Sequence, residues 1–104
     1  MKNEEEKSLP GHELVEQGLT DLAQDRLTDS ALLLLVAAPR LRNLGIDVPT
    51  RSFAKPIEHL LYEQLEARLG ADAHSHYNSL LRRINSYAHA LEREQSANPS
   101  KGET

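Results

Sequence analysis

The chain has 104 residues, 38% of them apolar and 27% charged, which suits one folded domain and is too short for two. Its formal net charge is −4, so it lacks the positive charge typical of a nucleic-acid-binding domain. It contains no cysteine, and this excludes disulfides, thiolate metal sites and a cysteine nucleophile.

No secretory signal or membrane span is recognisable in the sequence. The stretch from Met1 to Lys7 is charged and no apolar run follows it. The longest apolar run, Ala31 to Ala38, has eight residues, whereas a spanning helix needs about 20. We therefore expect a soluble protein, cytoplasmic by default and without a membrane partner.

The two ends of the chain differ in composition from its middle. Residues 1–8 are charged and lack apolar spacing, so we expect a flexible acidic N-terminus. Residues 96–104 are polar and predict a disordered tail. Residues 9–95 then form a single helical domain.

The first half of this domain has two helical patterns. From about Pro10 to Ala23, apolar residues fall on one face of a helix, which also contains Gly18. This glycine either marks a close helix crossing or has no special role. The next helix, Ser30 to Ala38, is apolar on all sides and should be central, with Thr28 or Asp29 as its N-cap and Pro39 ending it.

The second half begins with a short helix, Pro39 to Leu44, followed by a loop over residues 45–55. Ile46, Val48 and Phe53 should hold this loop on the core. A further helix starts at Pro56 and ends at Gly70. Asp72 should cap the last helix, which runs to about Glu94. Its continuous apolar stripe is formed by Tyr77, Leu80, Leu81, Ile84, Tyr87, Ala88 and Leu91.

These patterns predict an all-α fold, a compact bundle of four main helices plus one short helix, with a long C-terminal helix. No stretch alternates as a β-strand would. A bundle of about 90 ordered residues has little surface with which to cover the long apolar stripe, so we expect self-association, most simply as a homodimer.

The polar face of the last helix is the leading candidate for function. Asn78, Arg82, Asn85 and His89 recur at spacings of four, three and four, which aligns them along the helix. Residues 73–91 contain no Glu or Lys, although a solvated helix face usually carries both. A merely solvated face stays open as an alternative. We expect a non-enzymatic interaction or regulatory module whose face binds an unidentified protein partner.

A second hypothesis is a nucleic-acid-associated protein. Residues 31–60 carry a net charge of +2, while residues 1–30 carry −5. The basic loop could instead pair with the acidic first helix of the same chain or of a neighbour, and we favour this pairing. The arginines available to nucleic acid would be Arg40, Arg42, Arg51, Arg82 and Arg83.

A third hypothesis is enzymatic. Five residues separate Arg83 from His89 and six separate Arg82 from it, and both spacings resemble the motif of HEPN-superfamily helical ribonucleases. The resemblance implies that His89 acts as general acid or base while the arginine stabilises phosphate charge. It is limited to these spacings, so we expect no enzymatic activity.

The chain has five histidines, a residue that commonly binds metal ions. His12 and Glu16 lie four residues apart, as do His59 and Glu63, so each pair shares a helix face. A metal site needs a third and fourth ligand, which no motif supplies. We therefore expect no metal and no cofactor.

Overall fold

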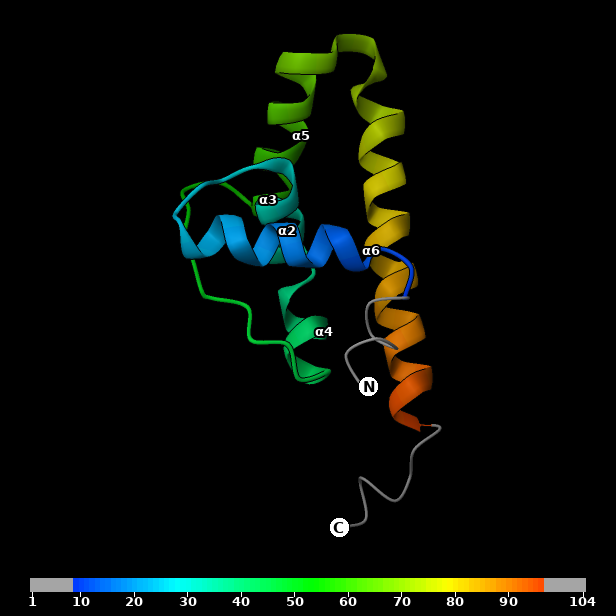
Figure 1. Cartoon of the computed structure of the whole chain (residues 1–104). Coiled ribbons are helices and arrows are strands. Elements are labelled where there is room, and N and C mark those ends of the chain that lie inside the picture. Colours follow the sequence, from blue (N-terminus) through cyan, green and yellow to red (C-terminus); the bar gives the residue numbers. More distant parts are fainter. Residues whose placement is uncertain (1–8, 97–104) are drawn as a thin grey trace.

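The computed structural model describes residues 9–96, and the predictions for residues 1–8 and 97–104 lie outside this part. Within it the all-α prediction is confirmed, and the described residues contain no strand (Figure 1). The elements are α2 (His12–Ala23), α3 (Asp29–Val36), α4 (Ala38–Asn43), α5 (Ile57–Leu69), the 3-10 turn η1 (Gly70–Asp72) and α6 (Ala73–Ser96).

The two longest helices, α5 and α6, form an antiparallel pair joined by η1 (Figure 1). Helix α3 packs against α5 and α6 and also contacts α2 and α4. Helix α2 runs across the molecule, and its first residues lie against the middle of α6 (Figure 1). The chain therefore folds around α3.

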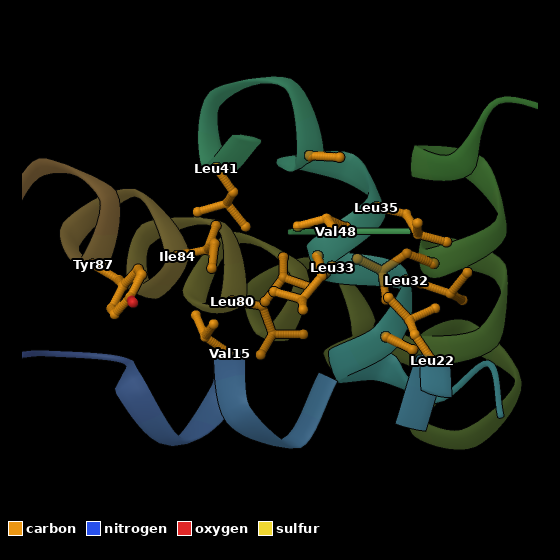
Figure 2. Packing of buried hydrophobic residues seen from close by; sticks show 14 of the residues in the cluster. Val15, Leu22, Leu32, Leu33, Leu35, Leu41, Val48, Leu80, Ile84 and Tyr87 are labelled. Atoms are coloured by element: carbon orange, nitrogen blue, oxygen red, sulfur yellow. The ribbon is translucent and has the colours of Figure 1, made fainter. Parts of the chain in front are cut away.

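The prediction that the apolar helix is central is confirmed. Its residues from Ala31 to Leu35 are each at most 5% exposed. Figure 2 shows Leu32, Leu33 and Leu35 of this helix among side chains of α2 and α6. Leu41 and Val48 cover another side. A short helix that is apolar on every face can be stable only if neighbours cover every face, as they do here.

The bounds of α3 are shorter than expected. Thr28 is the N-cap, because its Oγ1 accepts a hydrogen bond from the backbone N–H of Ala31 at 3.2 Å. The helix ends at Val36, two residues before the predicted end at Ala38. Pro39 has no N–H to donate to the carbonyl of Leu35, so the helical ladder stops and α4 begins.

Gly18 marks a close crossing of α2 and α3. A Cβ atom at this position would lie 2.7 Å from the Ser30 carbonyl oxygen and 2.7 Å from Leu34 Cγ. Gly11, at the start of α2, has a φ of +81°, and its Cβ would lie 2.9 Å from the Arg83 carbonyl oxygen. These two glycines let α2 pack directly on the backbones of α3 and α6.

Most of the apolar stripe of α6 is buried within a single chain, while Tyr77 and Leu81 are half-buried. Leu80, Ile84, Tyr87 and Leu91 are each at most 6% exposed. The chain's own helices therefore cover most of this stripe, and the stripe alone gives little reason to expect a second copy; self-association stays a prediction.

The loop before α5 and the two ends of α6 can also be compared with the sequence predictions. Val48 is buried, and Ile46 and Phe53 pack against the core, as expected for the loop. Helix α6 includes Ser96, which was expected to begin the tail. Asp72 ends η1 and directly precedes α6, at the position where it was expected to cap the last helix.

Candidate functional site

A groove of about 810 Å³ lies along the exposed face of α6. Its opposite side is formed by Leu9 and Pro10, which precede α2, and by Arg40 of α4. We call it the α6 groove and define it by its lining residues: Leu9, Pro10, Arg40, Arg82, Asn85, Ser86, His89, Ala90, Arg93 and Glu94.

The α6 groove brings together three of the four residues predicted to bind a partner. Arg82, Asn85 and His89 all line it. Asn78 does not, and its side-chain amide nitrogen lies instead 3.2 Å from His74 Nε2, one turn earlier on the same helix. The predicted face is therefore divided, with its C-terminal part in the groove.

Several polar side chains in the groove have no partner within the described part of the chain. Arg82, Asn85, Ser86 and Arg93 make no hydrogen bond or ion pair to any described residue, and all are exposed. They share a helix face because they follow one another at intervals of three, one and seven residues. Since residues 73–91 contain no carboxylate, Arg82 has no acidic neighbour on its own helix.

Ser86 and Arg93 were not among the residues predicted to bind a partner. Both continue the register of Arg82, four and eleven residues further along α6, and this periodicity could have identified them. Arg40 belongs to the groove only through the tertiary fold, because it comes from a different helix.

Arg40 is held at the edge of the groove by Glu92. Its Nε and Nη2 atoms donate to the two carboxylate oxygens of Glu92 at 3.2 and 3.1 Å. These hydrogen bonds from Arg40 lower the pKa of the Glu92 carboxyl group, although partial burial opposes them. The His89 ring lies nearby, with Nδ1 3.9 Å from Glu92 Oε1. Because Glu92 neutralises Arg40, Arg40 contributes less positive charge to the α6 groove than the unpaired Arg82 does.

Two further arginines of the nucleic-acid hypothesis hold backbone in place. Arg42 donates to the carbonyl oxygens of Val48 at 2.9 Å and Pro49 at 3.2 Å, which fixes the loop before α5. Arg51 donates to the Leu22 carbonyl oxygen at 3.0 Å, at the end of α2.

In the described part of the chain, only Arg51 of the four basic residues in positions 31–60 forms the favoured pairing with the first helical segment, and Arg83 of α6, outside that cluster, also pairs with α2. Arg51 lies 3.1 Å from Asp25, directly after α2, and Arg83 lies 3.2 Å from Glu13 in its first turn. Arg40 differs, because its partner is on the last helix. Of the five arginines considered for nucleic acid, Arg82 alone has no partner within residues 9–96.

The structure separates Arg83 from His89, the first of the two pairs in the ribonuclease hypothesis. Six residues of helix place Arg83 and His89 about 120° apart around the axis of α6. Arg83 turns to Glu13, whereas His89 lines the α6 groove. Arg82, one residue earlier, is the arginine that shares the groove with His89.

The paired histidines and glutamates do not build a larger cluster in the described structure. His12 Nε2 lies 3.5 Å from Glu16, and Glu63 pairs instead with Lys55 at 3.1 Å. Between residues 9 and 96, no three potential ligands gather at one point. None of the helices described there has the length and apolar character needed to cross a membrane.

One buried polar residue, Asp21, was missed by the sequence analysis. It is 1% exposed, and its carboxylate accepts hydrogen bonds from Thr28, Gln17 and Arg26 at 2.6, 3.0 and 3.0 Å. The Thr28 hydroxyl is the main cause of its lowered pKa, against the opposing effect of burial. Asp21 lies three residues after Gly18 and so on the same, buried face of α2. This spacing is the one feature of the sequence that could have indicated its burial.

Comparison of this chain with protein-family models, with curated proteins and with solved structures finds no match.

Proposed function

We propose that this protein is a non-enzymatic interaction module that binds a protein partner in the α6 groove. The observation that carries the proposal is Arg82, an exposed guanidinium with no partner among the described residues, in a groove with Asn85 and His89. An arginine left unpaired beside other unpaired donors is suited to an interface, where arginine is enriched.

The positions of the other arginines make nucleic acid the weaker hypothesis. Arg40, Arg42, Arg51 and Arg83 all donate to oxygen atoms of the same chain. A nucleic-acid surface instead presents several free cations along the path of the phosphates. The negative net charge of the whole chain also opposes binding to a polyanion.

Self-association stays a prediction and is separate from the groove. Leu27 is the one large apolar residue between positions 9 and 96 that is classed as exposed, at 41%. Stable homodimers bury mainly apolar surface, and such a patch is not evident there. Light scattering over a range of protein concentrations distinguishes monomer from dimer.

The proposed function is tested by affinity capture with the full chain and two variants. Arg82→Glu reverses a groove charge, and Lys55→Glu reverses an exposed charge that pairs with Glu63 on the other side of the fold. We expect Arg82→Glu to lose a specific protein that both the wild type and Lys55→Glu retain. Circular dichroism should show the same helix content in all three. The same captured proteins with Arg82→Glu as with the wild type would refute the proposal.

A further inference from the structure

We propose that the occupant of the α6 groove is an extended, acidic segment of the partner protein. This inference rests on the proposed function, since it names the chemistry of the partner at the same site. It follows from the arrangement of donors, charges and apolar contacts in the groove.

The charges of the groove select an anionic occupant. Arg82 and Arg93 are not neutralised by any described residue, and Asn85 and Ser86 add neutral hydrogen-bonding groups between them. Glu94 is the one carboxylate among the lining residues, and it lies at the C-terminal end. A planar guanidinium binds a carboxylate through two parallel hydrogen bonds, so each free arginine offers a defined carboxylate site.

The spacing of the two arginines sets the length of the occupant. Arg82 and Arg93 are eleven residues apart, and a helix rises 1.5 Å per residue, so they are about 16 Å apart along the axis of α6. An extended peptide covers about 3.3 Å per residue. Two acidic side chains about five residues apart, or a continuous acidic run of six to eight residues, would reach both arginines.

The remaining lining favours a peptide over a nucleic acid. Leu9, Pro10 and Ala90 give the groove apolar patches that can contact aliphatic side chains and backbone. No Phe, Tyr or Trp lines it, and the single imidazole of His89 offers no row of rings on which successive bases could stack. Proteins that bind single-stranded nucleic acid generally depend on such stacking.

The test is a titration of the full chain with octaglutamate, followed by ¹H–¹⁵N correlation spectra. Octaglutamine serves as the neutral peptide, and an oligothymidylate of matched charge serves as the nucleic acid. We expect octaglutamate alone to shift the backbone amides of Asn85, Ser86 and His89. Because Glu4, Glu5 and Glu6 precede the groove in sequence, the titration is repeated with all three changed to Gln. Binding by either form supports the proposal.

Two substitutions locate the binding site. Arg82→Gln and Arg93→Gln should each weaken octaglutamate binding by about tenfold, the size expected for the loss of one charge-assisted hydrogen bond. Lys55→Gln, which removes an exposed charge outside the groove, should leave the affinity unchanged. Failure of octaglutamate to bind either form, equal binding of octaglutamine, or tighter binding of oligothymidylate would overturn the proposal.

This result can be separated from that of the capture experiment. Suppose that Arg82→Glu loses a specific protein, while octaglutamate neither binds the chain nor displaces that protein. The proposed function is then correct, and the inference that the occupant is acidic is wrong. If octaglutamate binds at Arg82 while no captured protein depends on Arg82, the groove chemistry is right and the proposed function is wrong.

Discussion

Thr28 Oγ1 joins the first two helices of the fold through a single hydroxyl group. It donates to Asp21 Oδ2 at 2.6 Å and accepts from the Ala31 N–H at 3.2 Å. The same oxygen therefore caps α3 and offsets part of the desolvation free energy of the buried Asp21 carboxylate, near the end of α2. This connection fixes the turn that brings α3 into contact with α2.

Removing this hydroxyl should destabilise the protein. Thr28→Val keeps the shape of the side chain but loses the cap, which alone is worth about 1 kcal/mol. It also removes a donor from the buried Asp21, so the free energy of unfolding should fall by more than the cap alone accounts for. Urea unfolding measures this loss. Thr28→Ser, which keeps the hydroxyl, should stay close to the wild type, and an equal loss in both variants would contradict the account.

The stability of the fold should decrease in acid. The pKa of Asp21 is lowered by the Thr28 hydrogen bond, and the pKa of Glu92 by the hydrogen bonds from Arg40. A carboxyl group whose pKa is lower in the folded state stabilises the fold above its unfolded pKa of about 4 and loses this contribution as the pH falls through the folded value. The melting temperature should therefore fall below pH 4. Because Asp21→Asn cannot titrate, its melting temperature should fall less steeply there.

Gly18→Ala should be destabilising even though alanine is the better helix former. Alanine favours a helix by about 1 kcal/mol over glycine, whereas overpacking costs about 1–3 kcal/mol. The added Cβ meets both Leu34 and the Ser30 backbone, so α2 and α3 must separate. In a double-mutant cycle measured by urea unfolding, Gly18→Ala should cost less free energy of unfolding in the Leu34→Ala background than in the wild type. Some cost should remain, because the contact with the Ser30 carbonyl is still present. If Gly18→Ala cost nothing in the Leu34→Ala background, the Leu34 side chain alone would account for the clash.

Much of the fold could be predicted because its main determinants are local. The uniform apolarity of Ala31 to Leu35 predicts a central helix, and the alternatives Thr28 and Asp29 already include the true cap. The end of α3 was missed by two residues because the interruption depends on which carbonyl Pro39 leaves without a donor. The burial of Asp21 needs three donors from two elements, so composition and periodicity alone cannot establish it.

The candidate site could be predicted only in part. The register of Arg82, Asn85 and His89 is a property of one helix, and all three line the α6 groove. The other side of the groove comes from Leu9, Pro10 and Arg40, which only the tertiary fold brings to α6. The charges in the sequence also do not show which arginines are paired. Arg82 and Arg83 are neighbours in the chain, but Arg83 faces Glu13 whereas Arg82 faces the α6 groove.

The ion pair between Arg40 and Glu92 should limit the charge available to an acidic occupant. Both side chains are about 40% exposed, so solvent screens the pair and it adds little to stability. Glu92→Gln leaves the Arg40 guanidinium without its carboxylate at the edge of the groove. We therefore expect octaglutamate to bind about two- to fivefold more tightly, with little change in the free energy of unfolding.

The matched control for this substitution is Glu63→Gln, which removes the carboxylate of the exposed pair with Lys55 and changes the net charge equally. If the gain came from net charge alone, both variants would bind octaglutamate more tightly to the same extent. A gain confined to Glu92→Gln assigns it to Arg40 in the groove. The gain should also shrink as salt rises from about 50 to 300 mM, because charges separated by more than a Debye length are then screened. A gain that persists at high salt would contradict an electrostatic origin.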